Sequence, residues 1–307
     1  MTGELYRIEA DASAPAGAVL LHALTGFVDA GHAGRLAVAH LLATLEHRVL
    51  ATFDVDQLLD YRSRRPAMLF DEDHWAGYEQ PRLVLYEARD EVGTAFLILT
   101  GAEPDLQWER FADAVRELVE RFGVRLTVGL GAVPMPVPHT RPVTVTAHAT
   151  RPELISSYRR WFGTVEVPGS VSALVELRLG EAEHDAMGFT VHVPHYLARM
   201  EYPESARGLL EHVARTSGLA LPLAALRSAA QQVLAEVEEQ ISRSKEITAL
   251  VAGLEARFDA AAGAFGTAAF DQLPMLTTDA EPLPTGDEIA AELEQFLAEQ
   301  EDGPATD

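Results

Sequence analysis

The sequence predicts an α/β protein in which a mostly parallel β-sheet is covered by helices on both faces. Over residues 1–219, short β-rich apolar runs alternate with stretches of helical spacing, which is the pattern of βαβ units. Beyond Pro222 this alternation stops and long helical repeats follow. The net charge changes at the same point, from −10 over 1–219 (20 basic and 30 acidic side chains) to −13 over 220–307 (4 and 17). We therefore expect a core domain over 1–219 and an acidic helical region over 220–307.

Each strand of the core is predicted from a compact apolar run, and each helix from apolar residues three and four positions apart. The predicted strands are, in chain order, 18–24, 48–55, 83–86, 94–100, 126–130, 143–147 and 189–193, and the predicted helices are 33–45, 105–121 and 170–179. The acidic segment 87–93 predicts a hairpin turn. The hairpin that this turn closes is long and apolar, and an unpaired strand edge of that kind promotes association. We therefore expect a second copy of the chain to cover the edge.

The carboxyl-terminal region is predicted to be helical, with a break. Apolar residues recur at helical spacing over 226–258, either in one long helix or in two that meet near 242–244. The segment 263–284 contains many small residues and three prolines, which predicts a poorly ordered connector. A last helix is expected to begin near Thr285, and residues 301–307 are expected to form a disordered tail.

The composition excludes several classes of function. The chain has 307 residues, with 24 Lys and Arg against 47 Asp and Glu, a formal charge of −23 and no cysteine. Nonspecific binding to nucleic acid or to an anionic membrane needs a cationic surface, so neither is expected. Without cysteine there is no disulfide, thiolate metal site or cysteine nucleophile. The first eleven residues lack the pattern of a signal peptide and no run of 18 apolar residues occurs, so we expect neither a signal peptide nor a membrane span, and the cytoplasm is the expected location.

A glycine-rich stretch follows the first long predicted strand and contains Gly26, Asp29 and Gly31. Its spacing matches neither a dinucleotide fingerprint nor a phosphate-binding loop with a following Lys. One interpretation is a turn whose amides and Asp29 face a ligand at the carboxyl end of the sheet. In the other, Asp29 only caps the helix that begins near Ala30, and the glycines let the chain turn.

Two Pro-His pairs each follow a predicted strand, at His139 and at His195. Since ligands of open α/β sheets bind at the carboxyl ends of strands, both histidines stand where a site is expected. Each could serve a ligand as a hydrogen-bond partner or general base, or belong to a rigid structural loop. Arg141 could bind an anion or pair with one of the many carboxylates. We expect Asp29, His139 and His195 to share one cleft, with Phe27 and Tyr196 among its walls.

Metal ligands and nucleophiles are weakly represented. The run Asp71-Glu-Asp-His has possible ligands but is typical of a solvated turn. His192 and His195 lie three residues apart at a strand end, where they are unlikely partners for one ion. Ser170 is better placed to cap the following helix than to act as a nucleophile. We therefore expect no metal and no cofactor, and the catalytic residues stay unknown.

Six motifs follow one another over nearly the whole chain: Gly26-Phe-Val-Asp-Ala-Gly, Asp60-Tyr-Arg-Ser-Arg-Arg-Pro, Gly101-Ala-Glu-Pro-Asp-Leu-Gln-Trp-Glu-Arg-Phe, Pro138-His-Thr-Arg-Pro, Val193-Pro-His-Tyr-Leu and Leu283-Pro-Thr-Gly-Asp-Glu-Ile. In this order they resemble the actinobacterial branch of the proteasome assembly chaperone 2 family. The resemblance implies a three-layer α/β/α core similar to purine nucleoside phosphorylases. It also implies a β-hairpin insertion used in oligomerisation, within about 65–100, and a carboxyl-terminal helical lid over a ligand site. It implies no established activity.

Two functions follow from these observations. The first is a non-catalytic oligomeric protein with a ligand-binding or chaperone-like assembly role. A homotrimer is the oligomer we expect from the resemblance. The second is an enzyme that acts on a small ligand, either a nucleoside-like compound or a hydrolase substrate. The residues expected to contact a ligand in either case are Gly26, Asp29, Gly31, His139, Arg141, His195 and Tyr196.

Overall fold

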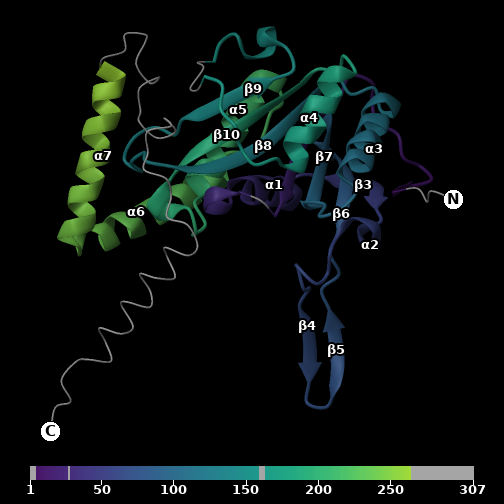
Figure 1. The fold of residues 1–307 in the computed structure, drawn as a ribbon, viewed down its shortest axis with the longest axis horizontal. Helices are drawn as coiled ribbons and strands as arrows, with labels where there is room; N and C mark the ends of the chain where they lie inside the picture. The colour runs from purple at the N-terminus through teal and green to yellow at the C-terminus, as the bar shows by residue number, and fades with distance from the viewer. Residues whose placement is uncertain (1–4, 27, 159–162, 264–307) are drawn as a thin grey trace.

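The computed structural model describes residues 5–26, 28–158 and 163–263, and its body is one β-sheet between helical layers (Figure 1). The strands of this eight-stranded sheet are β1 (Tyr6–Ile8), β2 (Val19–Thr25), β3 (His47–Phe53), β6 (Leu83–Arg89), β7 (Ala95–Ala102), β8 (Leu126–Met135), β9 (Val145–Ala149) and β10 (Ala186–Pro194). Their order across the sheet is β1-β3-β6-β7-β2-β8-β10-β9.

The α/β class is confirmed, but the expectation of a mostly parallel sheet is wrong. The pairs β7–β2, β2–β8 and β8–β10 are parallel, and every other neighbouring pair of this sheet is antiparallel. A tight turn between Asp90 and Thr94 joins β6 to β7, so these strands must run in opposite directions. The hairpin β6–β7 lies between β3 and β2, so both of its edges are covered by strands of the same chain.

Helices cover both faces of the sheet because its strands carry apolar residues on both sides. On one face α1 (Ala33–Thr44) and α5 (Pro203–Ser217) pack in an apolar cluster with Leu21 of β2. On the other, α3 (Trp108–Arg121) and α4 (Val171–Glu181) pack with Leu20, the preceding residue of the same strand. Helix α5 falls where the sequence predicted no helix.

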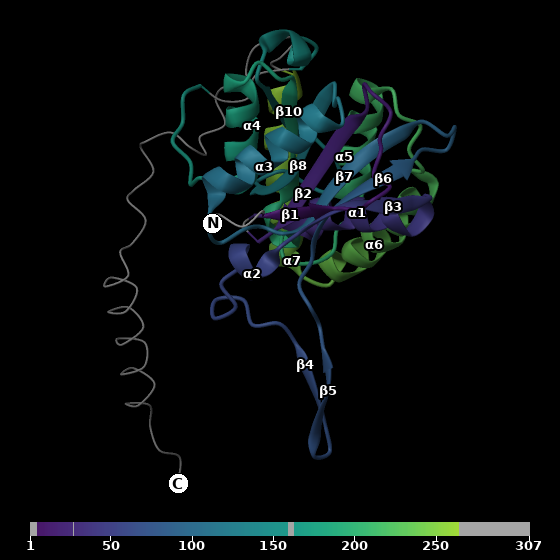
Figure 2. The same cartoon turned by 90° about the vertical axis from the view of Figure 1, so that its right-hand side faces the viewer.

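A two-stranded hairpin stands away from this body (Figures 1 and 2). Its strands are β4 (Met68–Asp71) and β5 (His74–Tyr78), which pair with each other in a separate sheet. The chain enters it after the short helix α2 (Val55–Leu58) and leaves it into β6. We call residues 60–82 the arm. The insertion was expected over about 65–100, but β6 and most of β7 lie within that range and belong to the main sheet.

Two helices follow α5, α6 (Ala224–Ser242) and α7 (Lys245–Gly263), and they meet at Arg243 and Ser244. Two helices were one of the alternatives open from the sequence. Helix α6 packs against α5 and adds Leu226 and Val237 to the apolar cluster of α1 and α5. Within the described ranges, no helix is both long enough and apolar enough to cross a bilayer. The connector expected over 263–284, the last helix and the tail lie almost wholly outside the described residues.

Candidate functional site

The loop after β8 and the turn after β10 meet at a hydrogen-bonded pair, His139 and Tyr196. Tyr196 lies in the 3-10 turn η3 (His195–Leu197), which follows β10 directly. Its hydroxyl oxygen lies 3.0 Å from the backbone nitrogen of His139 and 2.7 Å from Nδ1 of the same residue. The two Pro-His segments are therefore joined to each other, although 57 residues separate them in the chain.

These contacts define the protonation of the His139 ring. The Tyr196 hydroxyl accepts the backbone N–H of His139. Because donation of the hydroxyl proton to Nδ1 satisfies both groups of the second contact, we assign the ring proton of His139 to Nε2. Nε2 is buried, and no described residue forms a hydrogen bond with it. Burial lowers the pKa of His139, while the charges of Glu238 on α6 and Glu255 on α7 act in the opposite direction. The ring is thus a neutral donor at neutral pH, with its N–H unused within the described part of the chain.

Helix α7 is tied to this loop by ion pairs. Arg141 donates to both carboxylate oxygens of Asp259, at 2.8 and 2.6 Å, and to Glu255 at 3.2 Å. Thr140 also donates to Glu255. The hydrogen bonds from Arg141 lower the pKa of Asp259 below its ordinary value. The guanidinium therefore pairs with carboxylates, which was one of the two interpretations open from the sequence.

His195 lies beside this pair but on the surface. Its ring meets Tyr196 edge to face with 5.4 Å between centroids, and Tyr196 meets His139 in the same way at 5.9 Å. Edge-to-face contacts thus connect three rings in a row, from the exposed His195 through Tyr196 to the buried His139. His195 and His139 therefore contact the same tyrosine without contacting each other through a hydrogen bond.

Asp29 is used by helix α1. Its carboxylate accepts the backbone N–H of Gly34 at 2.8 Å and of Arg35 at 3.1 Å, so it satisfies the free amides of the first turn. Gly31 has a positive φ of 63°, and a Cβ there would lie 2.9 Å from Cβ of Tyr202. The N–H of Gly31 donates to the carbonyl oxygen of Ala198, one residue beyond η3. The glycine loop thus reaches the turn of His195 and Tyr196 through its backbone, while its carboxylate serves α1. That one ligand contacts both Asp29 and His139 stays a prediction.

Gly26 faces a different partner, Arg64 at the base of the arm. A Cβ at Gly26 would overlap the guanidinium of Arg64, which donates to the Thr25 carbonyl oxygen at 3.2 Å and pairs with Asp105 at 2.8 Å. The carboxylate of Asp105 also accepts the N–H of Asp60. This contact, which sequence reasoning missed, fixes the arm's base to the end of β2. Phe27 lies outside the described residues.

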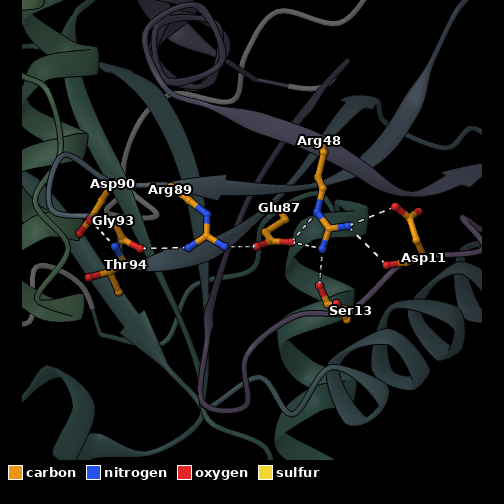
Figure 3. Close-up of polar contacts among 8 residues, drawn as sticks. All are labelled: Asp11, Ser13, Arg48, Glu87, Arg89, Asp90, Gly93 and Thr94. Carbon is orange, nitrogen blue, oxygen red and sulfur yellow. Dashed lines mark hydrogen bonds and ion pairs between the residues drawn. The ribbon is translucent and has the colours of Figure 1, made fainter.

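A second polar cluster, also missed from the sequence, surrounds Glu87 at the opposite end of the sheet (Figure 3). Arg48 donates to the Glu87 carboxylate at 2.8 and 2.6 Å, and Arg89 approaches it at 3.4 Å. Arg48 also donates to the carbonyl oxygens of Asp11 and Ser13. Although Arg48, Glu87 and Arg89 line a shallow hollow, the buried Glu87 holds both guanidinium groups, and the cluster fastens the amino-terminal segment to the sheet.

Across the described ranges, no group of three or more His, Asp and Glu side chains is arranged to hold a metal ion.

Comparison with known proteins places the chain in a family. The PAC2 family model matches residues 23–241. The solved structure of Rv2714 from Mycobacterium tuberculosis, of unknown function, is similar with a TM-score of 0.82 and 53% identity, covering 84% of this chain and 92% of that one. The structure of a Corynebacterium glutamicum protein of unknown function is similar with a TM-score of 0.80 and 39% identity, covering 85% of this chain and 99% of that one.

A third structure has a more informative description. The M. tuberculosis proteasome-assembly chaperone homologue Rv2125 is similar with a TM-score of 0.70 and 26% identity, covering 76% of this chain and 99% of that one. No curated protein matches the chain. The family expected from the six motifs is thus confirmed, and the chain belongs to the PAC2 family.

Proposed function

We propose that this PAC2-family chain is a non-catalytic, oligomeric assembly protein that binds other protein chains through its arm. The observation that carries the proposal is the arm's surface. Five large apolar residues of the hairpin each expose between 51% and 64% of their area: Met68, Leu69, Phe70, Trp75 and Tyr78. Such a concentration of exposed apolar area on one element is typical of a protein-binding surface.

The arm's isolation supports the same conclusion. A lone two-stranded hairpin is marginally stable in water, because it buries too little apolar area to offset the loss of chain entropy. The Phe70 and Trp75 rings contact each other, with 5.0 Å between centroids, but both remain more than half exposed. A partner that covers this face would supply the missing burial.

The chemistry of the expected site also favours binding over catalysis. The Asp29 carboxylate is engaged by α1 amides and the Arg141 guanidinium by carboxylates of α7. A relative described as a proteasome-assembly chaperone homologue is 26% identical, which supports an assembly role. We propose a homotrimer as the oligomer and a protein subunit as the partner that it helps to assemble.

The test is the assembly state of the full chain with and without the arm's aromatic face. Phe70→Ser with Trp75→Ser should shift the mass measured by light scattering from that of an oligomer to that of a monomer. The matched control is Val92→Ser with Leu177→Ser, since both residues are exposed apolar positions outside the arm. An oligomer that survives the arm variant, or a wild-type monomer at micromolar concentration, would refute the proposal.

A second candidate function rests on the unused Nε2–H of His139. A small ligand with a hydrogen-bond acceptor could occupy that position beneath the α6–α7 helices, with Tyr196 as its neighbour. If the ligand is also turned over, the protein is an enzyme that acts on a nucleoside-like ligand or on a hydrolase substrate, and the implied likeness to purine nucleoside phosphorylases favours the former. Mass spectrometry of small molecules released from freshly purified, denatured protein tests for the ligand. Turnover of the released compound would then separate enzyme from binding protein.

A further inference from the structure

Two features beside the candidate site are of kinds that bind anions in proteins, and carboxylates of the chain itself occupy both. The first is the amino terminus of α1, where free backbone amides attract negative charge. Asp29 fills this position, because its carboxylate oxygens accept the N–H groups of Gly34 and Arg35 at 2.8 and 3.1 Å. A phosphate or a ligand carboxylate could reach these amides only by displacing Asp29.

The second feature is the guanidinium of Arg141, in the loop after β8. Arginine commonly forms forked contacts with the phosphate and carboxylate groups of ligands. Here Nε and Nη2 donate to the two carboxylate oxygens of Asp259, and Nη1 donates to Glu255. The other contacts of Nη1 are with Thr140. Two carboxylates of α7 therefore use and neutralise the charge that a ligand anion would need.

Negative charge also surrounds the His139 ring. The charged groups that act on it are both carboxylates, Glu238 of α6 and Glu255 of α7. Burial raises the pKa of Tyr196, and the charge of Glu255 raises it further. Tyr196 therefore stays protonated and the buried ring of His139 stays neutral. The site thus offers a hydrogen-bond donor without offering a positive charge.

The donor in question is Nε2–H of His139, which is buried and has no acceptor among the described residues. A buried donor without an acceptor is unfavourable, so a ligand that brings an acceptor is stabilised there. An anionic acceptor would meet repulsion from Glu238 and Glu255, and repulsion is strong where water is excluded. A neutral carbonyl oxygen or aromatic ring nitrogen makes the same hydrogen bond without that repulsion.

We infer that the ligand of the His139 site is uncharged, that it presents a carbonyl oxygen or a ring nitrogen to Nε2–H, and that the site rejects phosphate and phosphorylated compounds. The inference rests on the second candidate function above, the ligand site, and specifies which ligands it takes. It also separates this chain from the phosphorylases that its core was expected to resemble. Phosphorolysis needs phosphate beside the nucleoside, and Asp29, Glu255 and Asp259 occupy the two anion-binding features described here.

The test compares matched compounds on the full chain by isothermal titration calorimetry. The pairs are inosine with inosine 5′-monophosphate and uridine with uridine 5′-monophosphate, and inorganic phosphate is titrated alone. We expect at least one nucleoside to bind, its monophosphate to bind at least tenfold more weakly, and phosphate to give no binding at millimolar concentration. Small molecules released from the freshly purified, denatured protein should likewise be uncharged at pH 7.

A charge variant tests the cause of the rejection. Glu255→Gln with Asp259→Asn removes two negative charges and frees the Arg141 guanidinium, so the monophosphate should bind about tenfold more tightly than it does to the wild type. The matched control is Glu236→Gln with Glu246→Gln, which removes two exposed carboxylates of the same helices. Because neither of them acts on His139, the control should keep the preference of the wild type. Circular dichroism should show the same folded core in both variants.

The outcomes separate this inference from the function on which it rests. A monophosphate or phosphate that binds as tightly as the uncharged nucleoside would overturn the inference and leave the ligand site in place. A released compound that carries a phosphate or carboxylate group would overturn it in the same way. If none of the five compounds binds and no small molecule is released, the second candidate function itself fails.

Discussion

Two hairpins follow each other in this chain and have opposite environments. The arm's hairpin β4–β5 and the hairpin β6–β7 are separated by four residues, and both are rich in large apolar side chains. Leu83, Leu85 and Phe96 of β6–β7 are almost completely buried, whereas the apolar residues of β4–β5 are more than half exposed. Both segments thus form hairpins, but only β6–β7 lies between other strands of the main sheet, and only its apolar residues are buried.

The boundary between the two hairpins is held rigidly. Gly101 at the end of β7 has a φ of 146°, and a Cβ there would overlap the carbonyl oxygen of Arg82, the last residue of the arm. The backbone of the arm's exit therefore packs directly on β7. Together with the Arg64 contact to Thr25 and Asp105, this close approach fixes both ends of the arm to the sheet.

The largest expected difference between the two hairpins is in the free energy of unfolding. Phe96→Ala should cost about 3–5 kcal/mol, because it removes a buried ring and leaves a cavity. Trp75→Ala should change the stability of the monomer by only about 0.5 kcal/mol or less, since its ring is exposed. Urea denaturation measured at concentrations where the chain is monomeric checks both values. A cost for Trp75→Ala near that for Phe96→Ala would show that the arm is packed on the body.

Alanine substitutions at three glycines of the two hairpins should lower the free energy of unfolding by different amounts. Gly101→Ala should cost about 2–3 kcal/mol, because it adds a steric overlap to a strained φ. Gly93 lies in the β6–β7 turn with a φ of 88°, and an added Cβ would have nothing within 4 Å. Gly93→Ala should therefore cost about 1 kcal/mol, from the left-handed conformation alone. Gly77→Ala in the arm, where the added Cβ would meet Leu69 at an ordinary 3.4 Å, should be nearly neutral. Equal costs at all three positions would contradict the close approach at Gly101.

Acid should destabilise the sheet through buried histidines. Burial lowers the pKa of His192 on β10 from 6.5 to about 4. The unfolded chain binds a proton at this residue near pH 6.5, and the folded chain only near pH 4. Above pH 6.5 the residue is neutral in both states and costs the fold nothing, whereas the free energy of unfolding decreases as the pH falls from 6.5 towards 4. Each pH unit in this window removes about 1.4 kcal/mol.

The measurement is the slope of unfolding free energy against pH between 6.5 and 5. His192→Gln should make this slope shallower by about one proton, because it removes the group that the unfolded chain protonates and the folded chain does not. An unchanged slope in His192→Gln would mean that its ring is protonated as easily in the folded as in the unfolded state.

Buried charge gives a smaller contrast between the two hairpins. Glu87→Gln on β6 should cost about 1–3 kcal/mol, because its neutral amide weakens the contacts with Arg48 and Arg89 at a buried position. Glu79→Gln at the exposed base of the arm should have an effect of about 0.5 kcal/mol or less. Thermal unfolding of both variants in parallel gives the comparison. Equal shifts in melting temperature would show that the Glu87 cluster contributes no more than a surface charge does.

The sequence predicts the elements of this fold better than their directions. Strand β2 and helix α1 were expected at 18–24 and 33–45 and lie at Val19–Thr25 and Ala33–Thr44, because their apolar patterns are continuous. The hairpin turn expected over 87–93 is confirmed by the antiparallel β6–β7 pair. The antiparallel pairing of β3 with β1 and β6, and of β9 with β10, could not be predicted, since an apolar run has the same composition in either direction. Helix α5 was missed because its buried positions include the small residues Ser205, Ala206 and Gly208, which do not stand out in an apolar pattern.

The candidate site shows the same limit. The positions of His139 and His195 after strands were visible in the sequence, as was the chance that Asp29 caps a helix. Tyr196 was expected in the same cleft as His139, but its hydrogen bond to that residue was not, and neither was the pairing of Arg141 with Asp259, which lies 118 residues away in the chain. Contacts at such separations depend on how the elements pack, which apolar spacing does not encode.

The smallest expected effect concerns α7. Like the arm it lies at the edge of the molecule, but unlike the apolar face of the arm it has a partner in the same chain, Arg141 of the loop after β8. Arg141→Ala removes its ion pairs with Asp259 and Glu255, so residues 245–258 should exchange amide hydrogens faster, while α3 on the far side of the sheet should not change. Asp113→Ala, which removes a surface ion pair of α3 with Arg116, is the matched control and should leave α7 unaffected. High salt should speed exchange in α7 of the wild type in the same direction, because the Arg141 pairs are partly exposed and therefore screened. Unchanged exchange in α7 for Arg141→Ala would mean that its buried residues Val251 and Leu254, and not the ion pairs, hold the helix over the His139 loop.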